Sequence, residues 1–511
     1  MKRKGVRGKQ RNQENQEIDI ISFTTDEDDY RKKIPAKAKK DIKNKKSKYE
    51  NREFVRVTYF FVGLFLLLMA YLVYFHIFQS KDIINSPYNV RLDSMADRVV
   101  RGEIQDRNGN VLAKTEVADD GTEKRIYPYG CLYAHVVGYD SHGKSGLEST
   151  ENFNLLTSNA FFMEQIIREF QERKNVGNNV ITTLDSDIQK AAHDALGTSK
   201  GAVVVIEVST GKILSLVSKP DFDPNEVASE WDALTTNTNS VLWNRATQGA
   251  YAPGSVFKIV TTLAYMRENS NYHNYHYDCT GEINHNGTVI HCAKNRKHGS
   301  EDLTTAFANS CNGAYSDIGL NLNYIKYKNT AKDLLFNSKL PCELPYASSK
   351  FQLTEDSADS EIMMTSIGQG KTQVSPYHMA LIAAAIGNGG ILMEPYMVDE
   401  VISYTGATVE KRMPKKYSKL MTSSEAAQLK QYMQAVVESG TGVALKNNTY
   451  SVAGKTGTAE YSSDKDKSHS WFMGFTNVEN PDLAISVVVE EADKTGVSAV
   501  SIAKRVLDAY Y

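Results

Sequence analysis

The chain has 511 residues, of which 41% are hydrophobic and 23% are charged. That hydrophobic share is ordinary for a globular protein, so it excludes a chain that is disordered throughout and allows a large core. The length allows two or three domains, and the formal net charge of −2 is distributed unevenly along the chain.

The first 53 residues differ in composition from the rest. Through Arg56 the chain has 18 basic and 10 acidic residues, a net charge of +8, against −2 for the whole chain. With few apolar residues, residues 1–53 are predicted to be a disordered cytoplasmic tail. Because the tail adjoins a membrane span, its basic runs favour contact with anionic lipid headgroups over binding to nucleic acid.

An apolar stretch over residues 57–78 follows the tail. Its centre, residues 60–70, carries no charge, and at a rise of 1.5 Å per residue the stretch is about 33 Å long, enough to cross a bilayer core. We therefore expect one transmembrane helix over residues 54–78 of a cell-membrane protein. Basic residues precede it, which predicts a cytoplasmic N-terminus with residues 79–511 outside. A buried core helix fits this setting less well. So does a cleaved signal peptide, because the stretch is long and no small-x-small cleavage site follows.

The outside portion is predicted to begin with a small N-terminal module over residues 79–178. Within it, Asn108 and Gly109 stand between two stretches of strand-forming residues, which is a strong hairpin-turn signal. Residues 181–196 read as a strand that runs into a helix. They open a second domain, which we expect over residues 179–511.

The second domain is predicted to have an α+β fold. A β-hairpin early in the domain and three strands near its end indicate a five-stranded antiparallel sheet flanked by helices on both faces. Ser375 as N-cap and Pro376 as first helical residue predict a further helix that ends at residue 386. The five strands and the final helix are expected at residues 201–208, 212–218, 452–461, 469–476, 483–491 and 497–510.

Short serine and lysine motifs indicate chemistry in this domain. S-x-x-K recurs along the chain, and four candidate copies have their serine at positions 141, 255, 462 and 501. Ser255 alone follows a tight Ala-Pro-Gly turn and opens an apolar helix. The free N–H groups at a helix N-terminus stabilise a developing negative charge. Ser255 is therefore the candidate nucleophile.

Lys258 is the candidate base for Ser255. A spacing of three residues places the hydroxyl and the amine on one face of the helix. The positive end of the helix dipole and burial both lower the pKa of a lysine, so a neutral Lys258 could take the Ser255 proton. The other three serine–lysine pairs lie in a turn, in a polar loop and inside the final helix. We interpret them as solvated pairs.

An S-x-N motif ends a helical stretch at residues 310–312. Ser310 can hydrogen-bond Lys258 or relay a proton, and Asn312 can hold a substrate amide. Taken alone, the tripeptide would be a helix cap or a turn. Its middle residue, Cys311, stands where the common motif has Asp, and we interpret it as a small packing residue.

K-T-G occurs twice, and the first copy reads as a strand at a sheet edge. There Lys455 supplies a positive charge, and the hydroxyls of Thr456 and Thr458 can bind a carboxylate. Gly457 lets a substrate backbone approach closely. The second copy, which begins at residue 494, reads as a turn without a role.

In this order the three motifs are the set found in penicillin-binding proteins and β-lactamases. The chain resembles a class B penicillin-binding protein, a monofunctional peptidoglycan D,D-transpeptidase, over residues 98–511. Other segments carry the same resemblance: Arg-Gly-Glu-Ile-Gln-Asp-Arg-Asn-Gly from 101, Asn-Arg-Ala from 244, Ile-Gly-Gln-Gly from 367 and Ser-Trp-Phe-Met-Gly-Phe from 470.

This resemblance implies the penicillin-binding transpeptidase fold and a two-step reaction. Ser255 would be acylated by the penultimate D-Ala of a peptidoglycan stem peptide with release of the terminal D-Ala, and an amine of a second strand would then take the acyl group. The backbone N–H groups of Ser255 and Thr458 would form the oxyanion hole. The resemblance further implies binding of β-lactam antibiotics and a polytopic glycosyltransferase partner. Neither a cofactor nor a metal is expected.

All five cysteines lie in the outside portion, where disulfides form. Cys279 and Cys292 flank a plausible hairpin over residues 281–290, so a disulfide between them is one hypothesis and free thiols are the other. A zinc site drawn from these two cysteines matches no common closed spacing. Its remaining ligands would be His285, His291 and His298.

Other functions remain open. A D,D-carboxypeptidase would use water in place of the acceptor amine. A β-lactam sensor would carry several membrane spans, and a β-lactamase would be compact and secreted, so the single span and the N-terminal module disfavour both. A bifunctional enzyme is disfavoured because only about 100 residues separate the span from residue 181, too few for a glycosyltransferase domain.

Overall fold

The chain divides into two compact units, Met1–Asp82 and Ile83–Tyr511. The predicted tail lies largely outside the described residues. The computed structural model describes residues 36–79, 95–171, 173–460 and 467–511.

In its described part the first unit is one long helix, α2 (Ala36–Tyr74), continued by a π-helical turn at Phe75–Gln79. Its segment Arg52–Tyr74 has 23 residues and a mean hydropathy of 2.1, and is exposed along its whole length. This confirms a helix long and apolar enough to cross a membrane. The helix begins earlier than the predicted residue 54, because the Lys- and Ala-rich sequence before the span consists of good helix formers.

The second unit contains the remaining helices and strands. Its α-helices are α5 (Gly146–Thr150), α6 (Asn152–Leu155), α7 (Phe162–Phe170), α8 (Ser186–Leu196), α9 (Val227–Thr235), α10 (Lys258–Glu268), α11 (Leu303–Ala308), α12 (Asn312–Leu320), α13 (Tyr324–Asp333), α14 (Asp359–Ser366), α15 (Pro376–Gly387), α16 (Ser423–Glu438), α17 (Ala492–Thr495) and α18 (Ala499–Tyr510). Its strands are β1 (Val99–Val100), β2 (Ile104–Gln105), β3 (Val111–Val117), β4 (Glu123–Ile126), β5 (Asn175–Val176), β6 (Asn179–Thr182), β7 (Gly201–Glu207), β8 (Ile213–Lys219), β9 (His276–Cys279), β10 (Glu282–His285), β11 (Thr288–His291), β12 (Gly299–Asp302), β13 (Ile391–Met393), β14 (Val398–Ile402), β15 (Thr408–Lys411), β16 (Lys416–Lys419), β17 (Val452–Glu460), β18 (Ser468–Thr476) and β19 (Leu483–Val489).

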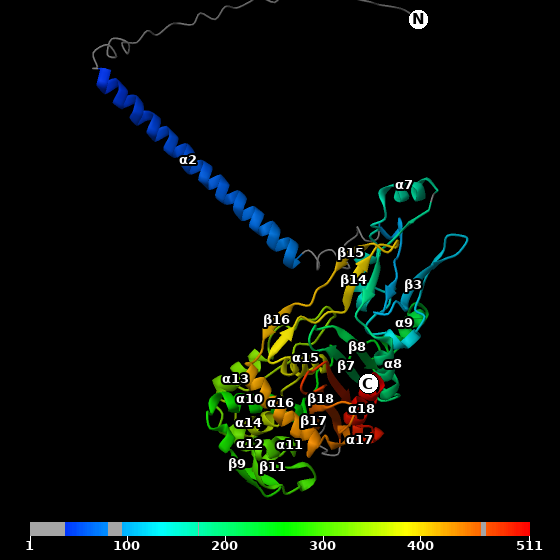
Figure 1. The fold of residues 1–511 in the computed structure, drawn as a ribbon, viewed down its shortest axis with the longest axis vertical. Helices are drawn as coiled ribbons and strands as arrows, with labels where there is room; N and C mark the ends of the chain where they lie inside the picture. Colours follow the sequence, from blue (N-terminus) through cyan, green and yellow to red (C-terminus); the bar gives the residue numbers. More distant parts are fainter. Residues whose placement is uncertain (1–35, 80–94, 172, 461–466) are drawn as a thin grey trace, which may run out of the picture. The chain divides into compact units, whose positions relative to one another are not determined.

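Five of these strands form the predicted antiparallel sheet, in the order β17-β18-β19-β7-β8 (Figure 1). Each strand agrees with its predicted range to within two residues. The final helix, α18, begins after Ser498, whose hydroxyl accepts from the Ser501 N–H as an N-cap. The sheet and its flanking helices confirm the α+β fold.

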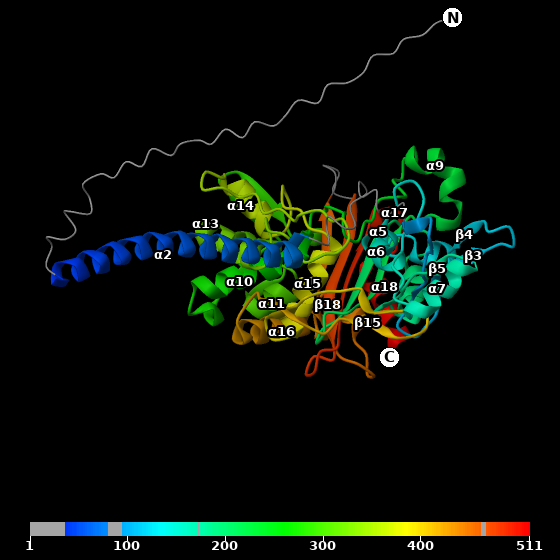
Figure 2. The same cartoon turned by 90° about the horizontal axis from the view of Figure 1, so that it is seen from above.

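Helices cover both faces of this sheet (Figure 2). Side chains alternate across a strand, so Val203 and Val205 of β7 pack into the core beneath α8 and α18. Val204 and Ile206 of the same strand join the core on the α15 side. Every residue of α15 is buried, and its start at Ser375-Pro376 is as predicted. Two covered faces explain why the strands read as continuous apolar runs.

A six-stranded sheet in the order β15-β14-β6-β2-β3-β4 forms the core of the N-terminal part. The turn between β2 and β3 is the predicted one. Gly109 there has a φ of +85°, and Asp106 Oδ1 accepts from the N–H groups of Asn108 and Asn110, both at 2.8 Å. Strands β14 and β15 join this sheet from residues 398–411, so it unites segments on both sides of residue 178.

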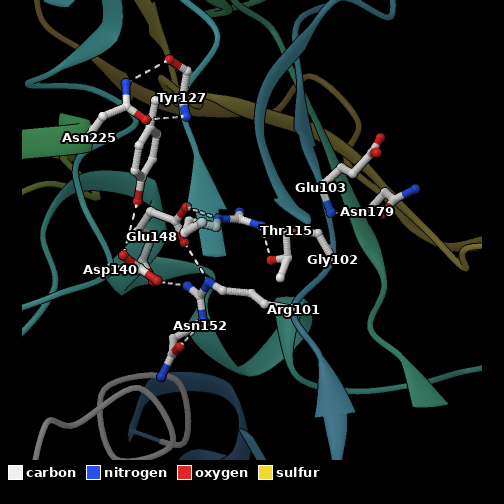
Figure 3. Close-up of polar contacts among 11 residues, drawn as sticks. Arg101, Gly102, Glu103, Thr115, Tyr127, Asp140, Glu148, Asn152, Asn179 and Asn225 are labelled. Atoms are coloured by element: carbon white, nitrogen blue, oxygen red, sulfur yellow. Dashed lines mark hydrogen bonds and ion pairs between the residues drawn. The ribbon is translucent and has the colours of Figure 1, made fainter. Parts of the chain in front are cut away.

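Glu148 is the centre of a buried ionic network that braces this N-terminal part (Figure 3). Its carboxylate accepts from Arg101 Nε at 2.5 Å and from Arg125 Nε at 2.7 Å. Burial alone would raise the pKa of Glu148, but the two guanidinium groups outweigh it and lower that pKa. Arg101 also bonds Asn152, and Arg125 donates to the Gly102 carbonyl at 2.7 Å. The Arg-Gly-Glu segment noted in the sequence therefore contributes to structure here.

Candidate active site

The turn before Ser255 is held by two close backbone contacts, one to the loop after α14 and one to strand β17. The Gly254 N–H donates to the Gly368 carbonyl at 2.8 Å. Gly254 has a φ of +55°, and a Cβ added there would lie 2.3 Å from the Thr458 carbonyl oxygen. Only glycine fits such a position. The Ala-Pro-Gly turn therefore sets Ser255, in the 3₁₀ turn Gly254–Phe257 that leads into α10, beside strand β17.

Strand β17 is an edge of the five-stranded sheet, and its free edge faces this turn. In an extended strand the N–H and the C=O of one residue point to the same edge. The Thr458 carbonyl contacts Gly254, so the Thr458 N–H also points away from β18 and towards the Ser255 segment. The backbone N–H groups of Ser255 and Thr458 thus lie on adjoining segments, an arrangement that can polarise a carbonyl placed between them.

Lys258 is completely buried, and its amine contacts the S-x-N motif. Lys258 Nζ donates to the Ser310 carbonyl at 2.7 Å, to Ser310 Oγ at 3.2 Å and to Asn312 Oδ1 at 2.8 Å. Burial lowers the pKa of Lys258 to about 8. The structure therefore brings together Lys258, Ser310 and Asn312, including an Asn312 contact with the amine that the sequence did not indicate, and makes the lysine a base that can be neutral near physiological pH.

The S-x-N motif forms a strained turn between α11 and α12. Ser310 has a φ of +57°, which is uncommon for a residue with a side chain. Asn312 Nδ2 donates to the His291 carbonyl at 2.9 Å, while its Oδ1 accepts from Lys258. An amide has two donors and two acceptor sites, so Asn312 keeps one of each for a substrate. Strain of this kind is typical of functional sites.

The K-T-G strand places a lysine beneath a row of hydroxyls. Lys455 is completely buried, donates to the Thr456 carbonyl at 3.1 Å, and has a pKa well below its usual value because of burial and the nearby Lys258 charge. Thr458 is exposed. Thr456 Oγ1 lies 2.6 Å from Thr441 Oγ1. Thr441 was not among the predicted site residues, because its only local signal is its position between two glycines in Ser-Gly-Thr-Gly.

Within the part of the chain that the structure describes, the competing motifs have no comparable setting. Lys144 N–H closes a turn on the Ser141 carbonyl at 3.0 Å. Ser501 is exposed and its hydroxyl donates to the Ser498 carbonyl at 2.7 Å. Lys494, in the second K-T-G, pairs with Glu491 within 2.5 Å and belongs to the short helix α17. The motif at residue 462 lies outside the described residues.

The cysteines adopt an arrangement that the sequence did not predict. The hairpin between Cys279 and Cys292 is present as β10–β11, but their sulfurs are 3.6 Å apart and both are free thiols. Cys311, interpreted above only as a packing residue, lies 3.8 Å from Cys292, sulfur to sulfur. His298 Nδ1 lies 3.3 Å from Cys279 Sγ. These four residues form the cluster of possible metal ligands within the described part of the chain.

The two other histidines considered for a zinc site lie elsewhere. His285 Nε2 is 3.0 Å from an Asp359 oxygen, and His291 Nδ1 is 3.1 Å from a Glu282 oxygen. The ligand set that was disfavoured from its spacing therefore differs from this cluster in two histidines and lacks Cys311, which is close to the other cysteines in space but not in sequence.

Comparison with protein families gives two matches. Residues 201–508 match the penicillin binding protein transpeptidase domain, and residues 101–180 match the penicillin binding protein A dimerisation domain. Together they include the five-stranded sheet, all three motifs and the Arg101 network.

Individual relatives agree with these matches. The chain is 31% identical over 474 residues to peptidoglycan D,D-transpeptidase PbpA of Mycolicibacterium smegmatis, which covers 86% of this chain and 94% of that protein. It is 28% identical to stage V sporulation protein D of Bacillus subtilis, over 74% of this chain and 61% of that protein. Among solved structures, the penicillin G acyl-enzyme complex of penicillin-binding protein A from M. tuberculosis has a TM-score of 0.73 and 30% identity, covering 80% of this chain and 99% of that one.

Proposed function

Because this chain belongs to the class B penicillin-binding proteins, the peptidoglycan D,D-transpeptidases of cell wall synthesis, we propose that it cross-links stem peptides through an acyl-enzyme on Ser255. One observation carries the proposal. The buried amine of Lys258 sits one helical turn from Ser255 and is held by Ser310 and Asn312, at 2.7 Å from the Ser310 carbonyl and 2.8 Å from Asn312 Oδ1.

In the first step Ser255 Oγ attacks the carbonyl carbon of the penultimate D-Ala. Lys258, in its neutral form, takes the hydroxyl proton. The carbonyl oxygen gains negative charge and accepts from the backbone N–H groups of Ser255 and Thr458. The C–N bond then breaks, and the proton passes to the leaving D-Ala nitrogen through Lys258 and the Ser310 hydroxyl. This leaves an ester on Ser255.

In the second step the amine of a neighbouring strand attacks this ester. Lys258 accepts the proton of the amine and returns one to Ser255 Oγ as the C–O bond breaks. A new amide joins the two strands and the enzyme is regenerated. Asn312, with one amide hydrogen and one lone pair uncommitted, holds the backbone amide of the donor peptide.

The K-T-G strand recognises the terminal carboxylate of the donor. Thr458→Val removes one hydroxyl without changing the size of the side chain, and a hydrogen bond to a charged group contributes about 1.5–3 kcal/mol. We expect acylation by β-lactams that carry a carboxylate to slow by roughly one to two decades. Stopped-flow or gel-based acylation rates measure this.

Two controls sharpen the Thr458 experiment. Thr235→Val changes another exposed threonine, on α9, and should leave the rate unchanged. An ester of the same β-lactam lacks the charge and should react with wild type and Thr458→Val at similar rates. Equal rates for the two proteins with the free carboxylate would remove Thr458 from the site.

A donor–acceptor assay separates this function from the D,D-carboxypeptidase alternative. The full-length protein in detergent is given a peptide ending in D-Ala-D-Ala and a peptidoglycan amine, and products are identified by mass spectrometry. A cross-linked product that grows with amine concentration supports the transpeptidase. Release of D-Ala by hydrolysis alone, at all amine concentrations, favours the carboxypeptidase.

The basic residues that precede the apolar segment of α2 support a cytoplasmic N-terminus with the catalytic domain outside. Protease added to intact cells should remove the C-terminal domain and spare an N-terminal tag, and the reverse pattern would refute the orientation.

A monofunctional transpeptidase also needs nascent strands, so its partner is a polytopic glycosyltransferase. Cross-linking in membranes that captures no such protein would count against the partner.

A further inference from the structure

We propose that helix α7 is a second membrane anchor, and that its apolar side inserts into the surface of the bilayer in which the segment Arg52–Tyr74 is embedded. Figure 1 shows α7 at the end of the N-terminal part that is remote from the five-stranded sheet. The inference takes no part in the serine chemistry. It also needs no assumption about which side of the membrane carries the catalytic domain.

Helix α7 turns its apolar side to solvent. Residues three and four positions apart lie on one side of a helix, and in α7 one side consists of Phe162, Met163, Ile166, Ile167 and Phe170. No residue of the helix is buried, and four of these five side chains are exposed. A surface helix of a globular protein normally turns such a side to the core, so α7 presents an apolar surface for something outside the chain's own core.

The polar side of α7 holds the helix in this orientation. Glu164 accepts a hydrogen bond from the Tyr404 hydroxyl, and the Arg168 guanidinium lies 4.9 Å from the centre of the Tyr404 ring. Gln165 Nε2 donates to the Ser158 carbonyl at 3.2 Å. These contacts use the side chains that would face water in an ordinary surface helix, and they leave the apolar side free to insert.

The path of the chain keeps a bilayer within reach of α7. Strand β5, which follows α7, pairs in parallel with β1, the first strand after the membrane segment. Lys174 Nζ, between α7 and β5, donates to the Ala96 carbonyl at 3.1 Å. Only 19 residues separate Gln79 from Val99, and at about 3.3–3.6 Å per residue they extend at most about 70 Å. The membrane is therefore the one apolar surface to which the chain itself tethers this helix.

The size and composition of the apolar side favour lipid over a second copy of the chain. Phe161, just before the helix, is 74% exposed, and Phe162 and Phe170 are 69% and 88% exposed. A buried phenylalanine contributes about 150–250 Å², so the three offer roughly 350–600 Å², less than the roughly 800 Å² that each partner of a stable dimer buries. Insertion into a bilayer needs no such minimum, and aromatic side chains are favoured at its interface.

Tryptophan quenching by brominated lipid tests the insertion. Full-length Phe170→Trp is reconstituted in phosphatidylcholine vesicles whose acyl chains carry bromine, and the emission of wild type is subtracted. We expect the added tryptophan to lose about half of its emission or more, at low and at high salt, because the contact is apolar. Val443→Trp, at an exposed position of the catalytic domain, should lose little. Equal quenching at the two positions, or quenching that disappears at high salt, would overturn the proposal.

Photo-cross-linking in membranes identifies the occupant of the apolar side. A benzophenone amino acid replaces Phe162 of the full-length protein, and the adducts are identified by mass spectrometry. Adducts with lipid, above the level given by the same group at position 443, support the anchor. Adducts mainly with a second copy, with another protein or with residues 80–94 of the same chain would each show a different occupant and overturn it. In detergent the probe-bearing protein should bind penicillin at the wild-type rate, because Phe162 is exposed.

Discussion

Ser255→Ala will abolish covalent labelling by penicillin. A β-lactam mimics the D-Ala-D-Ala amide and opens when the serine attacks, and its leaving group stays attached, so the adduct persists. Without Oγ there is no atom to form the ester. We expect one penicilloyl group per wild-type chain, on the peptide that contains Ser255, and none on Ser255→Ala, as measured by mass spectrometry of full-length protein.

The other serine–lysine motifs provide matched controls. Ser141→Ala, Ser462→Ala and Ser501→Ala each remove one competing serine, and each should label like wild type. Ser255→Ala should unfold at the same temperature as wild type, because Ser255 is only partly buried. A penicilloyl group found on any serine other than Ser255 would overturn the assignment of the nucleophile.

The strands of the catalytic sheet could be predicted well from the sequence, because each strand is indicated by its own residues and the turns next to it. Each strand is a continuous apolar run bounded by turn residues, and the hairpin turn at residues 209–211 fixes which strands are neighbours. The helix that follows Ser255 was equally clear. The turn before this helix requires a glycine, because Gly254 lies against the Thr458 carbonyl. That contact can be seen only in the folded structure.

What the sequence did not show depends on contacts between distant segments. Strands β14 and β15 join the N-terminal sheet from residues 398–411, and no pattern in those residues names their partner. Cys311 contacts Cys292 although 19 positions separate them, so spacing rules for zinc motifs missed the cluster. Thr441 became visible only through its contact with Thr456.

Lys258→Arg will also lose acylation while the protein stays folded. Arginine keeps a positive charge near the S-x-N motif, but its guanidinium remains protonated at any usable pH and cannot accept the Ser255 proton. Loss of a general base typically costs about 10²–10⁴-fold in rate, so we expect the penicillin acylation rate to fall by at least about 10²-fold. A thermal unfolding curve close to that of wild type would separate lost chemistry from lost structure, and rapid labelling of Lys258→Arg would exclude Lys258 as the base.

The pH dependence of acylation tests the same residue without a mutation. Burial lowers the Lys258 pKa to about 8, and a base works only in its neutral form, so the acylation rate should rise with pH and level off above that value. At pH 7 roughly one-tenth of the lysine would be neutral. Below the pKa, the acylation rate should therefore rise about tenfold with each added pH unit. A β-lactam whose own groups do not titrate between pH 6 and 10 is the appropriate probe. A rate that stays flat from pH 6 to 9 would mean that Lys258 does not supply the titrating base.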